Sequence, residues 1–260
     1  MKICFLSIFP DLVSSIFNGL SITRRATKRE LVWFDVINIR DFAFDKHKQV
    51  DDYAYGIGKG MILRFDVLLK ALDHAKKRFV NPYVILPSPR GEVLNKRMIN
   101  DLAKMNELIF ICPNYEGVDN RILRFINEEI SIGDYVISSG ELASFVILES
   151  ILRFRFSDDH LVRKENLLDD SFNYMGMDFL LEPLQYTRPR EVRINNNVVK
   201  VEKLLCSGDH AKIRDFLLME ALEITIFRKP YLFKLFMNRY SGQVDKKILY
   251  NACMNSVVPT

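Results

Sequence analysis

The sequence predicts an α/β fold in which a mostly parallel sheet is flanked by helices and followed by a smaller, mainly helical C-terminal domain. Over the first 155 residues, short apolar runs alternate with amphipathic stretches, which is the pattern of βα units around a parallel sheet. From Gly208 onward, the pattern predicts helices to the end of the chain. Residues 157–180 are polar, acidic and only weakly periodic, which is typical of an interdomain linker. We therefore expect a first domain over 1–156, a linker over 157–180 and a second domain over 181–260.

Each predicted element follows from its apolar pattern. Helices are predicted at 66–79 and 95–105, where apolar residues recur at helical spacing along one face. Residues 141–155 are apolar on most of the helical circumference, so this helix is expected to be deeply buried. In the second domain, residues 192–205 predict two strands joined at 195–197. The strands of the first domain are expected, in chain order, at residues 2–9, 31–39, 83–87, 107–112 and in the region 131–138.

The composition excludes several classes of protein. Of the 260 residues, 48% are hydrophobic and 27% are charged, which excludes a wholly disordered, collagen-like or low-complexity chain. The longest later apolar stretch, residues 142–156, is interrupted by three charged side chains, so no membrane span is predicted. The first apolar run is short and ends at Pro10 without a cleavage site of small residues. It is therefore predicted to be a buried strand and not a signal peptide.

The four cysteines lie far apart and form no CxxC pair and no Cys/His cluster. Neither a metal site nor a disulfide framework is therefore expected. Their simplest interpretation is that they are buried thiols in a reducing compartment, so we expect a cytoplasmic protein. The positions are Cys4, Cys112, Cys206 and Cys253.

The charge of the chain is unevenly distributed. The net charge of +4 comes from 37 basic against 33 acidic side chains and does not by itself identify a partner. Residues 203–247 contain nine basic and five acidic side chains, so their excess alone matches that of the whole chain. Aromatic residues such as Phe216 and Tyr231 are interleaved with this charge. Two interpretations are open: an ordinary amphipathic helical domain with solvated lysines, which this segment alone favours, and a nucleic-acid surface.

Glycine-rich loops indicate where a ligand would bind. The first predicted strand is not followed by a GxGxxG turn, so a Rossmann-type nucleotide site is not expected. Glycines are found instead at 55–61, 87–91, 115–119 and 131–141, each after or within a predicted strand. Any one of these loops is most simply a turn. Together they predict a pocket built from strand ends and rich in backbone donors and acceptors, which suits recognition of an adenine edge.

Several segments resemble a known family. YEGVDNR, EEISIGDYVISSGEL, LLEPLQYTRP and LLCSGDHAKI resemble signature segments of the bacterial tRNA (guanine-37-N1)-methyltransferase family TrmD, and DDYAYGIGKGM and LPSPRG are weaker versions of two others. The segments occur in the family's order over roughly residues 1–220. The resemblance implies a homodimeric methyltransferase of the SPOUT type that uses S-adenosylmethionine, with a deep trefoil knot in its first domain.

The resemblance also implies roles for individual positions. The guanine site of such enzymes lies across the dimer interface and uses the linker and second domain of the partner. The expected partners are therefore tRNA and a second copy of the chain, with no role for DNA or a membrane. The resemblance implies that S-adenosylmethionine is bound by Ser88, Pro89, Tyr115, Glu116, Gly117, Ile132, Gly133, Asp134, Tyr135, Val136, Ile137 and Gly140.

The chemistry of guanine N1 requires two further groups. N1 bears a proton, and a carboxylate within hydrogen-bond reach is suited to removing it. Negative charge then develops on O6, where a guanidinium would stabilise the transition state. The resemblance assigns these roles to Asp170 and Arg153, and it links Glu116 to the use of Mg²⁺.

Each of these residues also has a simpler interpretation. Without the resemblance, Asp170 is best interpreted as a helix cap before Ser171, and Arg153 as the partner of Glu149 in a salt bridge. Glu116 is otherwise an acid in a loop. Arg188 and His210 are candidates for contacts with RNA phosphates, or else for anchoring the YTRP segment and capping the following helix.

The chain departs from the family's usual pattern at several positions. Ile57 and Pro113 replace glycines, and Asn114 replaces an arginine. Proline has no N–H, so a cofactor contact through that amide is lost, whereas a contact through the carbonyl survives. The expected function is methyl transfer from S-adenosylmethionine to N1 of guanine 37 in tRNA. The alternatives are a SPOUT methyltransferase for another RNA position and, because of Pro113 and Ile57, a catalytically silent RNA-binding dimer.

Overall fold

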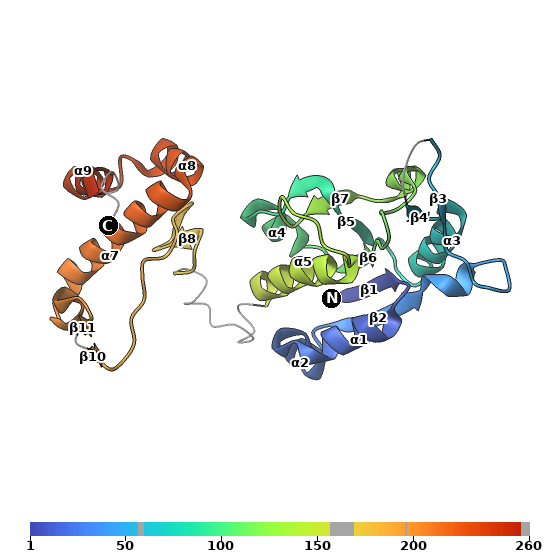
Figure 1. Ribbon diagram of the computed structural model, residues 1–260, viewed down its shortest axis with the longest axis horizontal. Coiled ribbons are helices and arrows are strands. Elements are labelled where there is room, and N and C mark those ends of the chain that lie inside the picture. The colour runs from blue at the N-terminus through green and yellow to red at the C-terminus, as the bar shows by residue number, and fades with distance from the viewer. Residues whose placement is uncertain (57–59, 157–168, 196, 256–260) are drawn as a thin grey trace. The chain divides into compact units, whose positions relative to one another are not determined.

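The computed structural model describes residues 1–56, 60–156, 169–195 and 197–255 (Figure 1). The chain divides into two compact units, Met1–Val162 and Arg163–Thr260. No helix within the described residues is both long enough and apolar enough to cross a membrane.

The N-terminal unit contains a five-stranded sheet in the order β2-β1-β6-β5-β7 (Figure 1). Every neighbouring pair is parallel, as the alternation of apolar runs and amphipathic stretches predicts. The strands are β1 (Lys2–Ser7), β2 (Trp33–Asn38), β5 (Tyr83–Val93), β6 (Glu107–Ile111) and β7 (Glu128–Ser131). The connecting elements are α1 (Pro10–Gly19), α2 (Ser21–Lys28), α3 (Phe65–Lys76), α4 (Lys96–Leu102), α5 (Gly140–Arg155), two 3₁₀-helices (Ile39–Phe42 and Asn120–Phe125) and a hairpin of β3 (Asp51–Tyr53) with β4 (Met61–Leu63).

Both faces of this sheet are covered. Alternate residues of β1 enter different hydrophobic clusters, with Phe5 packing beside residues of α1, α2, α4 and α5 and Leu6 beside residues of α3. Nine residues of α5 are buried, so the deeply buried helix predicted at 141–155 is confirmed. The helices predicted at 66–79 and 95–105 correspond to α3 and α4 and are also confirmed.

The strand predicted over 131–138 is wrong in its position. The last strand of the sheet, β7, ends at Ser131, and the predicted segment is a loop. Gly133 has a φ of 142°, and its N–H donates to Oγ of Ser131 at 3.1 Å. This turn prevents the chain from continuing as a strand.

The prediction of buried thiols holds for two of the four cysteines. Cys4 and Cys112 are buried, whereas Cys206 and Cys253 are exposed, which contradicts the prediction for them. Cys206 ends a surface 3₁₀-helix, and Cys253 lies on an exposed face of the last helix. Burial raises the pKa of the Cys4 thiol to about 12 and that of Cys112 well above its usual range, so neither buried group is a ready nucleophile.

The C-terminal unit is mainly helical, as predicted. Its core contains Leu222, Phe236 and Tyr240, together with Tyr174 from a short hairpin that precedes the helices. The predicted linker begins with residues 157–168, which lie outside the described part of the chain, and the boundary at residue 181 stays a prediction. The elements are β8 (Asn173–Tyr174), β9 (Met177–Asp178), β10 (Glu191–Ile194), β11 (Asn197–Lys200), a 3₁₀-helix (Lys203–Cys206), α7 (His210–Arg228), α8 (Pro230–Tyr240) and α9 (Lys246–Asn255).

One carboxylate of this unit has a destabilising environment. Oε2 of Glu220, on α7, is buried and has no hydrogen-bond partner among the described residues. Burial raises the pKa of this carboxyl, and the charges of Glu223 and Glu202 raise it further. Because the pKa is higher in the folded chain than in the unfolded chain, this group reduces stability as the pH rises through that value.

Replacing Glu220 with glutamine is therefore expected to increase the free energy of unfolding at pH 7 by ~0.5 kcal/mol, a small value because the side chain is partly exposed. Thermal unfolding at pH 7 and at pH 4 measures the effect. The gain should be present at pH 7 and small at pH 4, where the carboxyl is largely protonated in both states. An equal gain at both pH values would contradict the electrostatic explanation.

Candidate active site

Three of the predicted glycine-rich segments leave the sheet at one edge. Residues 113–117 follow β6 and residues 132–140 follow β7, while residues 88–91 form an irregular part of β5. These three strands are parallel neighbours, so the chain leaves each of them at the same edge of the sheet. The three segments that were predicted to form a pocket therefore follow neighbouring strands at this edge.

The segment that includes Ser88 and Pro89 bulges out of β5. Pro87 and Glu92 both lie opposite Ile130 of β7, so the residues between them are outside the regular pairing. The chain then returns very close to β7, because a Cβ on Gly91 would lie 2.4 Å from the backbone of Glu129. Only glycine fits there, which fixes the shape of the bulge.

The loop after β6 contains Tyr115, Glu116 and Gly117. Tyr115 has a φ of 55° and Gly117 a φ of 116°, so the chain turns sharply while the side chains of Tyr115 and Glu116 stay exposed. The loop is hydrogen-bonded to β4: the N–H of Glu116 donates to the carbonyl of Met61 at 3.0 Å, and that of Leu63 donates to the carbonyl of Gly117 at 2.9 Å. A Cβ on Gly60 would lie 2.5 Å from Cγ of Glu116. A larger residue at position 60 would therefore clash with the Glu116 side chain.

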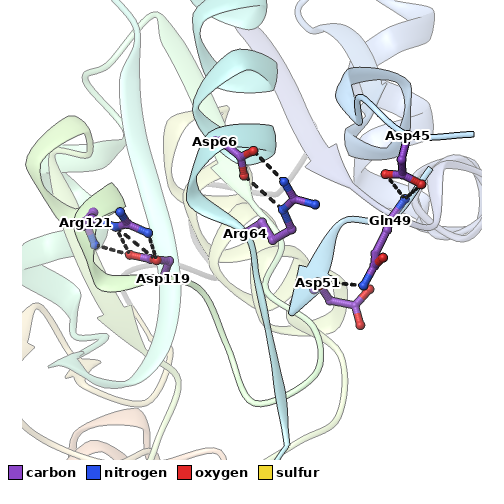
Figure 2. Close-up of polar contacts among 7 residues, drawn as sticks. All are labelled: Asp45, Gln49, Asp51, Arg64, Asp66, Asp119 and Arg121. Atoms are coloured by element: carbon purple, nitrogen blue, oxygen red, sulfur yellow. Dashed lines mark hydrogen bonds and ion pairs between the residues drawn. The ribbon is translucent and has the colours of Figure 1, made fainter. Parts of the chain in front are cut away.

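Arginine–carboxylate pairs that were not predicted from the sequence lie beside this loop and β4. Figure 2 shows Arg64 beside Asp66 and Arg121 beside Asp119, with closest distances of 2.7 and 2.6 Å. Each guanidinium lowers the pKa of its carboxyl partner. Asp66 and Asp119 therefore stay ionised and paired with arginine, which makes them poor candidates for a general base.

The loop after β7 presents apolar side chains to solvent. Tyr135, Val136 and Ile137 are exposed, and Val136 is 83% exposed. The loop ends at Gly140, whose N–H donates to the carbonyl of Pro113 at 2.9 Å. The Pro113 carbonyl thus connects the loops after β6 and β7.

A buried carboxylate at the start of α5 joins the same loops. Glu141 is fully buried, and its Oε1 accepts hydrogen bonds from Oγ of Ser7 at 2.5 Å and Nδ2 of Asn114 at 3.1 Å. Its Oε2 accepts from Oγ of Ser139 at 2.8 Å and Nδ2 of Asn114 at 3.3 Å. Gly140 in the GEL segment was predicted to bind S-adenosylmethionine, whereas no role was predicted for Asn114 or Glu141.

The predicted acid–base groups lie in different units. Arg153 is exposed on α5, and Asp170 is half-buried in the C-terminal unit. Asp170 precedes a turn in which the N–H of Asn173 donates to its carbonyl at 3.0 Å, and the turn leads into β8. The alternative that Asp170 caps a helix is therefore wrong. The roles of Asp170 at guanine N1 and of Arg153 at O6 stay predictions, as does the alternative that Arg153 pairs with Glu149.

A wide groove of about 1360 Å³ lies within the C-terminal unit. Its lining includes Arg188 and His210, the two residues predicted to reach RNA phosphates. His210 does not cap α7, because the carboxylate of Asp209 accepts the hydrogen bond from the N–H of Lys212. Two further arginines, Arg190 and Arg214, also line this groove. The side chains gathered here give it a basic character.

The three glycine-rich loops are neighbours at one edge of the sheet. Gly117 has open space beside its Cα at a φ that favours glycine, and the exposed loop residues surround this edge of the sheet. Within the described residues, no three side chains of His, Cys, Asp or Glu come together to hold a metal ion. Binding of S-adenosylmethionine by these loops and the use of Mg²⁺ both stay predictions.

These observations define an α/β protein with neighbouring glycine-rich loops at the carboxyl edge of a parallel sheet, followed by a helical unit with a basic groove. The family model described as tRNA (Guanine-1)-methyltransferase TrmD matches residues 1–235. The chain belongs to this family, which confirms the resemblance found in its sequence.

Curated relatives agree over nearly the whole chain. The relative from Fervidobacterium nodosum is 39% identical over 249 residues, covering 96% of this chain and 95% of its own length. The relative from Clostridium botulinum strain Eklund 17B is also 39% identical over 249 residues, with 96% and 98% covered. The relative from Sulfurihydrogenibium sp. is 41% identical over 235 residues, with 89% and 87% covered. All three are named tRNA (guanine-N(1)-)-methyltransferase.

Proposed function

We propose that this chain transfers a methyl group from S-adenosylmethionine to N1 of guanine 37 in tRNA, in the cytoplasm. The observation that carries the proposal is the family match over residues 1–235, together with relatives whose names specify N1 of guanine in tRNA. The position of three glycine-rich loops at one sheet edge supports a cofactor site there.

Asp170 and Arg153 act on different atoms of the guanine. Asp170 accepts the proton of guanine N1, which frees the lone pair of that nitrogen for attack. Arg153 donates to O6, where negative charge develops as the proton leaves. S-adenosylmethionine, when bound, supplies a methyl carbon that its sulfonium already makes electrophilic. The loops at Ser88, Tyr115 and Ile132–Gly140 then serve to align the reacting groups.

The active form is a homodimer, so that the linker and second unit of one copy reach the cofactor loops of the other. An exposed apolar surface on the N-terminal unit supports this arrangement. Phe9 and Leu12 at α1 and Leu142 and Val146 on α5 are each more than 40% exposed. A second copy would remove these side chains from water.

The test is methylation of unmodified tRNA carrying G36-G37, with the modified nucleotide mapped afterwards. The proposal predicts one methyl group per tRNA, on N1 of guanine 37. A methyl group elsewhere would favour a SPOUT methyltransferase for another position. Absence of S-adenosylmethionine binding by calorimetry, with tRNA still bound, would favour a catalytically silent dimer. Family membership favours neither alternative.

The basic groove gives a separate prediction about tRNA. Replacing Arg188 with alanine is expected to raise KM for tRNA about tenfold and to leave KM for S-adenosylmethionine unchanged, because a phosphate contact is lost. The slope of log affinity against log salt should fall by about one. Lys246→Ala, a charge change outside the groove lining, is the control. Equal salt slopes for the wild type and Arg188→Ala would contradict a phosphate contact.

A further inference from the structure

Glu141 is a fully buried carboxylate whose donors, within the described residues, are all neutral. They are the hydroxyls of Ser7 and Ser139 and the side-chain amide of Asn114. A buried carboxylate is costly unless each oxygen is hydrogen-bonded. Here each oxygen accepts two bonds, and the carboxylate lies in the first turn of α5, where the helix dipole also favours negative charge.

The donors come from separate parts of the chain. Ser7 ends β1, Asn114 lies in the loop after β6, and Ser139 ends the loop after β7 as the N-cap of α5. Asn114 directly precedes Tyr115, which has a positive φ. Any movement of the Asn114 amide therefore moves the turn that presents Tyr115, Glu116 and Gly117.

We propose that Glu141 and Asn114 are positioning residues for the methyl donor, because their hydrogen bonds set the spacing of the loops after β6 and β7. The proposal rests on the proposed function for the identity of the ligand. A backbone bond from Gly140 to Pro113 already connects these loops. The side-chain bonds between Asn114 and Glu141 add a second connection, one residue after Pro113 and Gly140. Two connections fix the relative orientation of the two loops, which a single bond leaves free.

The donor–acceptor pattern provides the test. In Asn114→Asp, two carboxylates face each other in a buried site, so one must take up a proton or the loop must move. In Glu141→Gln, an amide group faces the Asn114 amide, and half of the bonds lose a proper acceptor. In the double variant Asn114→Asp/Glu141→Gln, the amide and the carboxylate exchange places, so the pair can bond again with side chains of the same size.

The measurements are calorimetric Kd for S-adenosylmethionine, KM and kcat for both substrates, and the melting temperature. Each single variant is expected to raise Kd and KM for S-adenosylmethionine about tenfold and to change kcat and KM for tRNA less than threefold. In the double variant, Kd and KM for S-adenosylmethionine should return to within about threefold of the wild-type values. Thr23→Val removes a buried hydroxyl that bonds to the carbonyls of Phe17 and Leu20, and it controls for a loss of stability away from the loops. It should lower the melting temperature without changing Kd.

The outcomes separate this inference from the proposed function. If the wild type does not bind S-adenosylmethionine, the proposed function fails. If the wild type binds it and Asn114→Asp binds equally well, or if the double variant recovers its melting temperature but not its Kd, the positioning role is overturned. Should Asn114→Asp not fold, Asn114→Ala removes the donor without adding a charge and is expected to give the same increase in Kd.

Discussion

Replacing Asp170 with asparagine is expected to lower kcat about 100- to 10,000-fold, because the amide cannot accept the proton of guanine N1. Kd for S-adenosylmethionine should not change, since Asp170 lies outside the loops at the sheet edge. Single-turnover methylation of tRNA, with calorimetry for the cofactor, measures both quantities. The side chain keeps its size, so the half-buried position in the turn before β8 should tolerate the change.

A pH profile distinguishes a lost base from a structural defect. As the pH rises toward the pKa of guanine N1, the guanine loses its N1 proton to solvent without a catalytic base. Asp170→Asn should therefore recover part of its turnover at high pH. Asp215→Asn, which removes a carboxylate from α7 away from the groove lining, should have the kcat of the wild type. Near-normal turnover of Asp170→Ala would exclude Asp170 as the general base.

The sheet could be predicted from the sequence because each strand is a local apolar pattern. β1, β2, β5 and β6 all lie where short apolar runs indicate them. The last strand was predicted too far along the chain because residues 131–138 contain enough apolar side chains to resemble a strand. A single glycine in this segment makes it a loop. Gly133 turns the chain at φ 142°, and Ser131 bonds to its N–H. The apolar side chains of this segment therefore lie in an exposed loop and not in a strand.

The site was predicted only as far as local sequence allows. The glycine-rich segments identify the loops, and parallel topology brings them to one edge. The bonds from Ser7 and Asn114 to Glu141 join positions 134 and 27 residues apart, so no local spacing indicates them. The basic groove likewise depends on Arg188 in a loop and His210 on α7 coming together in the fold. Such contacts come from tertiary packing and not from local propensity.

Replacing Gly140 with alanine is expected to be among the most damaging small substitutions in the N-terminal unit. A Cβ there would lie 2.3 Å from Cδ, 2.4 Å from the carbonyl oxygen and 2.5 Å from the nitrogen of Pro113. Two of these atoms belong to the backbone, so the loop after β6 must move. That movement breaks the bond from Gly140 to Pro113 and displaces Glu141. We expect a loss of about 1–3 kcal/mol in unfolding free energy and at least tenfold weaker S-adenosylmethionine binding.

Denaturant unfolding and calorimetry test this expectation, with Gly19→Ala as the control. Gly19 ends α1, and a Cβ there has nothing within 4 Å, so that variant should be as stable as the wild type or slightly more stable. Replacing Pro113 with glycine in the Gly140→Ala background removes only the Cδ contact. The contacts with the carbonyl oxygen and the nitrogen remain, so the double variant should recover little stability. Full recovery would show that the proline ring, and not the close approach of the two backbones, requires glycine at position 140.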